Sequence, residues 1–282
     1  HVYAESRLTT RGGDWERLAF TLTPNATDPA GRFSIQLRQP GSVDLGYAFL
    51  QPGAWGRFKN LPVRRDVAEG LLDEGLTVMR YGGSAVNAAA YRWKNMIGPR
   101  DRRPPYKGTW YPYASNGWGI VDFLDFCDAA GFLAIPAFNL DETAADMADF
   151  IHYAEDPPNS EWGRKRAADG RAAPYPLRVI EIGNEEAVDD HYFSKFEPMA
   201  RALWAIDPHL ILTVGDFAYD KPITDPYHVS APRINTLAAH EKIMALAKEC
   251  HAEVWFDVHL ESDNPLALQT APIDSYQHAL TQ

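Results

Sequence analysis

The pattern of apolar and polar positions changes near residue 53. Before that point, four short segments alternate apolar and polar residues with a period of two, and Gly-Gly, Pro-Asn and Pro-Gly pairs separate them. Alternation of this kind, broken by turn residues about every 8–12 positions, is typical of antiparallel β-sandwich strands. We therefore expect residues 1–52 to form part of a β-sandwich.

After residue 53 the pattern alternates between helical spacing and short apolar runs. Helices are predicted at residues 63–75, 120–130, 143–155, 192–206 and 234–251. Strands are predicted at residues 76–83, 132–140, 177–184, 210–215 and 254–260. Strands that are apolar throughout and separated by helices predict a parallel sheet covered on both faces, hence an α/β fold.

Two architectures fit such a sheet: a doubly wound sheet and a (β/α)8 TIM barrel. A dinucleotide-binding doubly wound sheet needs a glycine-rich turn into a helix, but Tyr81-Gly82-Gly83-Ser84 lacks the third glycine. Polar residues instead end several strands: Arg80, Asn139, Asn184, Asp216 and His259. Barrel enzymes place their site residues in this way. We expect residues 53–282 to be a partial TIM barrel with about five of its eight strands.

Composition excludes several classes of protein. The 282 residues are 45% hydrophobic and 23% charged, which excludes an intrinsically disordered chain. The sequence has no apolar run of about 18–20 residues, so no membrane partner is expected. The net charge of −11, without a basic stripe, argues against a nucleic-acid partner. The sequence does not indicate a cellular location.

Glu185 is the strongest candidate for chemistry. It stands where the apolar run Val179–Asn184 stops, and a carboxyl half inside a dry, walled site acquires the raised pKa that a general acid needs. The neighbouring Asn184 offers one acceptor and two donors to a sugar hydroxyl. The alternative is that Glu185 and Glu186 only begin a helix, where carboxylates complement the dipole.

A second polar group closes the last predicted strand. Asp257, His259 and Glu261 share one face by alternation, which suggests an inward-facing site, although a single histidine there is more often structural. Asn139 also ends a strand, close to an ordinary helix start. No metal-binding spacing accompanies these residues, so neither a metal nor a cofactor is predicted.

An aromatic loop follows the first predicted strand of the sheet. It contains Trp110, Tyr111, Tyr113 and Trp118. Flat apolar rings of this kind suit the C–H faces of sugars, but they equally suit packing over the mouth of a barrel. The sequence leaves both interpretations open.

Three segments together resemble a known enzyme family. They are RYGGSAVNAAAYRWKNMIGPRDRRPP, NGWGIVDFLDFCDAAG and EIGNE. Their order over residues 60–261 resembles α-L-arabinofuranosidases of glycoside hydrolase family 51, which belong to a clan of retaining (β/α)8 glycosidases. The first 52 residues resemble the end of a carbohydrate-binding jelly roll, which some members carry.

The resemblance implies roles for individual residues. Glu185 would be the general acid/base, Asn184 its substrate-binding neighbour, and His259 the site histidine after the family's sixth barrel strand. Ser84 stands where the family usually has asparagine, and Glu261 where it has an aromatic residue; both positions touch sugar-binding subsites. With Asn139 and Trp118 they complete the expected substrate-binding set.

The nucleophile is not among these residues. In this clan it is a glutamate after the seventh strand, whereas this chain stops at Gln282, in the helix expected after the sixth. Glu261 is the only carboxylate placed to substitute, and it lies one strand early. We therefore expect the nucleophile outside this chain, in a missing segment or a second chain that completes the barrel.

The resulting hypothesis is a retaining α-L-arabinofuranosidase acting on oligo- or polysaccharide side chains. Two alternatives stay open. One is an endo-β-glucanase or xylanase of the same clan, and the other is a non-catalytic carbohydrate-binding protein that has lost its nucleophile.

Overall fold

The computed structural model describes residues 1–216, 223–230, 233–259 and 270–281. The chain divides into two compact units, His1–Gly46 and Tyr47–Gln282. This boundary lies a few residues before the predicted one at residue 53.

The first unit does not contain the four predicted strands. No helix or strand is present between His1 and Gly53. Strands are stabilised by pairing with a neighbour and by burying one apolar face, and the alternating apolar side chains here remain outside any core. Trp15, Phe33, Ile35 and Leu37 are among the exposed ones. The expectation of strands is therefore wrong for this segment, and its assignment to a carbohydrate-binding sandwich stays a prediction.

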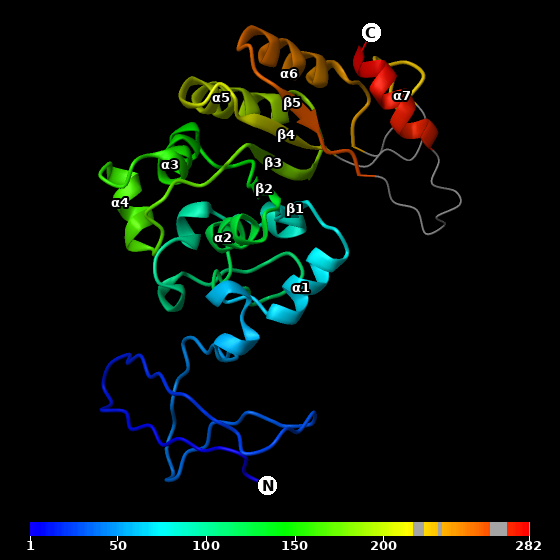
Figure 1. Cartoon of the computed structure of the whole chain (residues 1–282). Helices are drawn as coiled ribbons and strands as arrows, with labels where there is room; N and C mark the ends of the chain where they lie inside the picture. Colours follow the sequence, from blue (N-terminus) through cyan, green and yellow to red (C-terminus); the bar gives the residue numbers. More distant parts are fainter. Residues whose placement is uncertain (217–222, 231–232, 260–269, 282) are drawn as a thin grey trace. The chain divides into compact units, whose positions relative to one another are not determined.

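The second unit contains a parallel sheet of five strands (Figure 1). The strands are β1 (Val78–Tyr81), β2 (Leu133–Phe138), β3 (Val179–Glu186), β4 (Ile211–Asp216) and β5 (Val254–Phe256). The α-helices are α1 (Arg65–Asp73), α2 (Ile120–Ala130), α3 (Ala144–Glu155), α4 (Glu161–Ala168), α5 (Asp190–Ile206), α6 (Ala238–Glu249) and α7 (Thr270–Thr281). Short 3-10 helices lie at Ala54–Gly56, Phe58–Asn60, Gly83–Asn87, Trp93–Met96 and Arg100–Arg102.

The strands neighbour one another in chain order, β1-β2-β3-β4-β5, and every pairing is parallel. A doubly wound sheet reverses its order at a switch point, whereas the strands of a barrel follow one another around the axis. Successive crossover helices also pack on each other, α3 on α5 and α5 on α6, as in the outer ring of a barrel. The strand order excludes the doubly wound alternative for these five strands.

The sheet is strongly curved. At about 4.8 Å between neighbours, β1 and the end of β5 would lie about 19 Å apart in a flat sheet. Arg80 Nε of β1 nevertheless lies 3.1 Å from Oδ2 of Asp257, directly after β5. Only a concave face can bring these side chains together, so the carboxyl ends of the strands converge on one region.

Candidate active site

Glu185 lies on an irregularity at the end of β3. Ile182 pairs with Val214 of β4, but the next paired residue, Glu186, lies opposite Asp216, so three residues of β3 face one residue of β4. The backbone of Glu185 has φ 51°, in the left-handed region that non-glycine residues enter at a cost of roughly 1–2 kcal/mol. Such strain concentrates at functional sites. The bulge turns Glu185 out of the strand ladder and leaves its side chain 29% exposed.

Arg80 connects the groups that converge around Glu185. Its guanidinium forms a two-pronged ion pair with the buried carboxylate of Glu181, in which Nη2 lies 2.6 Å from Oε1. Nη2 also donates to Oδ1 of Asn184 at 2.8 Å, and Nε lies 3.1 Å from Oδ2 of Asp257. One cation on β1 therefore holds residues from β3 and from the end of β5.

Arg80 also fixes the orientation of the Asn184 side chain. A guanidinium carries only donors, so the amide oxygen of Asn184 must face it. The amide nitrogen then points to the other side, where it lies 3.5 Å from Oε2 of Glu185. The Asn184 carbonyl accepts a hydrogen bond from Asn87 Nδ2 at 3.0 Å. Asn184 is thereby held with its donor group toward Glu185.

His259 bridges two carboxylates. Its Nδ1 lies 3.0 Å from Oε1 of Glu185, and its Nε2 lies 3.0 Å from Oδ2 of Asp257. Burial lowers the pKa of His259, but the hydrogen bonds to Glu185 and Asp257 outweigh burial and hold the pKa above its usual value. His259 is thus in direct contact with the candidate acid/base.

Burial disfavours the charged form of the Glu181 side chain. Burial raises the pKa of its carboxyl to about 7, although the Arg80 guanidinium acts in the opposite direction. A carboxyl whose pKa is higher in the folded state than in the unfolded state binds more protons when folded. Its contribution to stability is complete below pH 4.5 and is lost as the pH rises toward 7.

Replacing Glu181 with glutamine should therefore remove one source of pH dependence. The free energy of unfolding of the wild type should fall relative to that of Glu181→Gln as pH rises from 4.5 to 7, by up to about 3 kcal/mol at 1.36 kcal/mol per pH unit. Urea unfolding at a series of pH values measures the difference. If the wild type instead gained stability relative to Glu181→Gln over this range, the conclusion that burial raises the pKa of Glu181 would be contradicted.

The remaining predicted residues lie in different surroundings. Asn139 is buried; Arg92 Nη1 donates to its Oδ1 at 2.9 Å, and its own amide donates to backbone carbonyls of the loop after β1. Trp118 packs against the core, and its carbonyl accepts from the Tyr81 hydroxyl. The Ser84 carbonyl accepts from Thr109 Oγ1 at 2.7 Å. Their roles toward a sugar stay predictions, and Glu261 lies outside the described residues.

Asp216, the polar residue that ends β4, contacts two helices. Its buried carboxylate accepts hydrogen bonds from His240 Nε2 and from the Tyr276 hydroxyl, both at 2.8 Å. These contacts attach α6 and α7 to the end of β4. Among the strand-end polar residues, the structure brings together Arg80, Asn184 and His259.

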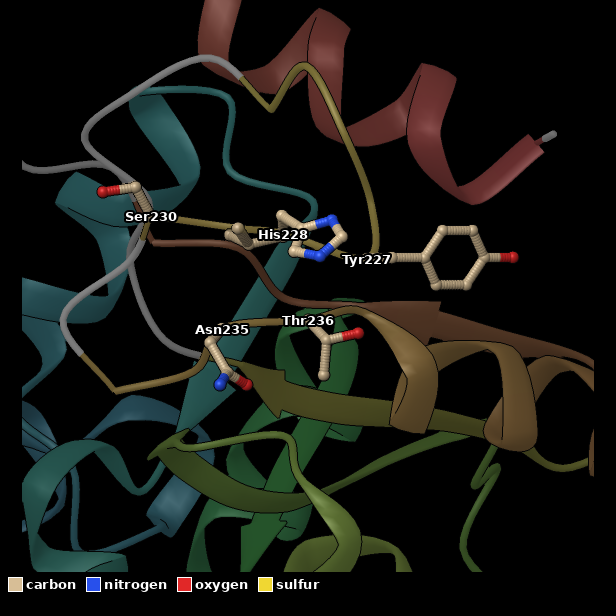
Figure 2. A pocket seen from close by; sticks show the side chains of 6 residues that line it. Tyr227, His228, Ser230, Asn235 and Thr236 are labelled. Carbon is tan, nitrogen blue, oxygen red and sulfur yellow. The ribbon is translucent and has the colours of Figure 1, made fainter.

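Two further surfaces lie on the loops. The rings of Trp110, Tyr111 and Tyr113 are 75%, 72% and 92% exposed. The loop between β4 and α6 forms a separate open pocket (Figure 2). Its lining residues are Tyr227, His228, Val229, Ser230, Asn235 and Thr236. The Tyr227 ring points away from the other side chains. From the same loop, Arg233 Nη1 donates to the Glu185 carbonyl at 2.6 Å.

Within the described ranges, no group of three or more metal-ligating side chains has the arrangement of a metal site. No described helix is long and apolar enough to cross a membrane.

Sequence reasoning did not single out Glu181, although a signal was present. A glutamate interrupts the otherwise apolar run Val179–Ile182, and an arginine interrupts the apolar run that ends at Tyr81. Opposite charges inside two strands of one parallel sheet indicate an ion pair, because a buried charge needs a partner. Alternation places Asp257 on a polar face, but it does not indicate the contact with Arg80.

Comparison with known proteins gives consistent matches. The family model described as "Alpha-L-arabinofuranosidase 1 domain" matches residues 71–270, more than half of the chain. An extracellular exo-alpha-L-arabinofuranosidase of Streptomyces chartreusis is 25% identical over 73% of this chain and 29% of its own length. Alpha-L-arabinofuranosidase 1 of Arabidopsis thaliana is 25% identical over 81% of this chain and 37% of its own length.

A solved structure shares the fold. It is that of a family 51 alpha-L-arabinofuranosidase from Bifidobacterium longum, with a TM-score of 0.54 and 24% identity, covering 66% of this chain and 36% of that one. The chain thus spans about a third of the length of the relatives it matches. Because the family model matches more than half of the chain, the chain belongs to the family described as the alpha-L-arabinofuranosidase 1 domain.

Proposed function

We propose that this chain is the acid/base-bearing part of a retaining α-L-arabinofuranosidase. The observation that carries the proposal is Glu185, which a β-bulge turns out of β3 into hydrogen-bonding contact with His259. The family match, and relatives whose names give this activity, support the choice of sugar.

In the proposed reaction Glu185 acts twice. It first protonates the leaving oxygen of the arabinoside, while a carboxylate nucleophile attacks the anomeric carbon and forms a glycosyl ester. Glu185, now ionised, then removes a proton from the water that hydrolyses the ester. In this proposal the Asn184 amide nitrogen, which is directed away from Arg80 and toward Glu185, donates to a sugar hydroxyl.

The nucleophile belongs, in this proposal, to polypeptide beyond the described residues. Glu181 and Asp257 are both engaged by Arg80, so neither is a free carboxylate facing substrate. A chain that spans about a third of its relatives' length leaves room elsewhere in such a protein for the seventh strand. We propose that this further polypeptide also completes the eight-stranded barrel.

A substrate panel tests the activity. Aryl α-L-arabinofuranoside, β-D-xyloside and β-D-glucoside should be compared, together with arabinoxylan, arabinan and β-glucan. We expect release of arabinose alone, with NMR of the first product showing the α-anomer, because two displacements restore the configuration. Release of xylo- or gluco-oligosaccharides would favour an endo-hydrolase of the same clan, and first-formed β-arabinose would contradict a retaining mechanism.

A second candidate function is non-catalytic carbohydrate binding, which the exposed aromatic residues favour. Trp110, Tyr111 and Tyr113 present flat faces that a binding protein can use without hydrolysis. Saturable binding of arabino-oligosaccharides with no product release by the full-length protein would establish that function instead.

A further inference from the structure

His259 makes contacts that constrain where protons can sit. Each ring nitrogen lies 3.0 Å from a carboxylate oxygen, Nδ1 from Glu185 and Nε2 from Asp257. A neutral imidazole has a single N–H, so it can donate to only one of the two carboxylates. Either the ring is an imidazolium, or one of the two carboxyl groups carries a proton.

The two carboxyl groups that contact His259 have different neighbours. Asp257 Oδ2 lies 3.1 Å from Arg80 Nε as well as 3.0 Å from His259 Nε2, so it is in ion-pair contact with a fixed cation. The charge of Arg80 also acts on Glu185, whose described side-chain contacts are with His259 and Asn184. The hydrogen bonds of the guanidinium go to Glu181 and Asn184, whereas the Glu185 side chain is turned toward His259. With Asp257 ionised, Nε2 must carry its proton and donate it to Asp257. A second proton is then shared between Nδ1 of His259 and Oε1 of Glu185.

We propose that Asp257 and His259 are positioning residues that store the acid proton of Glu185. The proton moves along one hydrogen bond, from Oε1–H of Glu185 to Nδ1 of His259, and the resulting imidazolium is balanced by the Asp257 carboxylate. The reverse movement returns Glu185 to its acid form. No other reactant is needed, and the roles rest on the proposed function of Glu185 as general acid/base.

The charges that face this pair come from several elements. Arg80 approaches from β1, Glu181 from β3 and Asp257 from the end of β5. On β4, the residue paired with Glu181 is the uncharged Thr213. Arg233, from the loop before α6, contacts the Glu185 backbone and favours the charged form of Glu186. Among the described residues, Asp257 is therefore the group whose neutralisation should most change the pKa of His259 while leaving Glu185 in place.

The first test needs no enzymatic activity. Nitrogen-15 NMR of the full-length protein labelled in histidine reports which ring nitrogen is protonated, and His259→Gln identifies the His259 signal among the nine histidines. We expect both nitrogens protonated at low pH, and the remaining proton on Nε2 above the titration midpoint. A remaining proton on Nδ1 would overturn the proposal, whatever the protein hydrolyses.

The second test removes the Asp257 charge. Asp257→Asn should lower the midpoint of the His259 titration by about one pH unit or more. The high-pH limb of kcat/KM should move down by the same amount with little change in KM, because the acid proton is lost earlier. Arg80 keeps Glu181 and Asn184 as partners in this variant, which favours retention of the fold.

Asp225→Asn is the matched control. Asp225 Oδ2 lies 2.8 Å from His228 Nδ1 in an exposed pair outside the site. This variant should change the His228 signal and leave both the His259 midpoint and the pH profile unchanged. An unchanged His259 midpoint in Asp257→Asn would overturn the proposal. If that variant does not fold, the wild-type protonation pattern still decides it.

The two proposals fail in different ways. The expected His259 protonation in a protein that releases no arabinose would overturn the proposed function and leave only the protonation pattern of the Asp257–His259–Glu185 contacts standing. Arabinose release with a His259 that does not respond to Asp257 would retain the function and remove the store.

Discussion

Replacing Glu185 with glutamine should reduce turnover of an unactivated arabinoside roughly 10²–10⁴-fold, the usual contribution of a positioned general acid. Glutamine keeps the size of the side chain and has no acid proton to give. An aryl arabinoside with a good leaving group needs little protonation, so bond cleavage in that substrate should be affected much less. The measurement is kcat/KM on an alkyl and a dinitrophenyl arabinofuranoside in parallel.

The alanine variant extends the same prediction. Glu185→Ala opens space beside His259 and removes the base for the second step, so the glycosyl ester should accumulate with the activated substrate. Azide, a small anion that needs no base, should enter that space and raise turnover by forming an arabinosyl azide of retained configuration. This product is chemical proof that Glu185 serves as acid/base rather than nucleophile.

The neighbouring carboxyl provides the control. Glu186→Gln makes the same substitution one residue later, on a half-buried side chain whose pKa burial raises. Its activity should stay within a few-fold of wild type on both substrates. Equal, modest losses on the two substrates in Glu185→Gln, or losses in Glu186→Gln as large as those in Glu185→Gln, would contradict the assignment.

The sheet was predictable because burial dictates its strands. A strand covered on both faces must be apolar along its length, and the run at 132–140 became β2 at Leu133–Phe138 with its ends trimmed. The last strand is shorter than its pattern suggested and ends at Phe256, where Asp257 begins to contact Arg80 and His259. The backbone N–H of Asp257 still donates to the Val214 carbonyl of β4 at 2.9 Å, while its side chain forms the contacts with Arg80 and His259.

Helix α4 could not be predicted from the pattern of apolar and polar residues. Its sequence, EWGRKRAA, has no apolar stripe to mark it. It begins because Ser160 Oγ accepts from Gly163 N at 2.9 Å, and it is held by the buried Arg166, which donates to carbonyls of Tyr153, Asp156 and Ala172. These partners lie outside the helix, so tertiary contacts rather than local periodicity stabilise it.

The candidate site also has residues that the sequence indicates and contacts that it does not. Glu185, Asn184 and His259 could be named because polar residues at strand ends gather at one edge of a parallel sheet. The network through Arg80 depends on the curvature that brings β1 to the end of β5, and the bulge depends on the register of β3 against β4. Neither the curvature of the sheet nor the register between two strands can be predicted from the apolar and polar pattern of a single strand.

A single methyl group on β4 should disturb both the fold and the site. Gly215 lies opposite the bulge, and a Cβ there would lie 2.5 Å from the carbonyl oxygen of Gly183 and 2.9 Å from the backbone nitrogen of Asn184. Backbone atoms cannot rotate away as a side chain can. The bulge carrying Asn184 and Glu185 must therefore move in Gly215→Ala.

The cost should appear in stability and in turnover together. Overpacking of this kind typically costs about 1–3 kcal/mol, which corresponds to a fall in Tm of several degrees in a domain of this size. A displacement of about 1 Å at Glu185 can reduce kcat/KM by about 10²-fold. Thermal unfolding and arabinoside hydrolysis of the same preparation measure the two effects.

Gly70→Ala separates this mechanism from a general effect of replacing glycine. Gly70 lies on α1, and no atom lies within 4 Å of the position that a Cβ would occupy there, so alanine should raise helix stability by up to about 1 kcal/mol and leave turnover unchanged. A Gly215→Ala protein as stable and as active as Gly70→Ala would mean that the bulge does not depend on the empty space at Gly215. Loss of turnover with unchanged stability would instead show that the bulge moves at little energetic cost, and that the position of Glu185 alone limits the reaction.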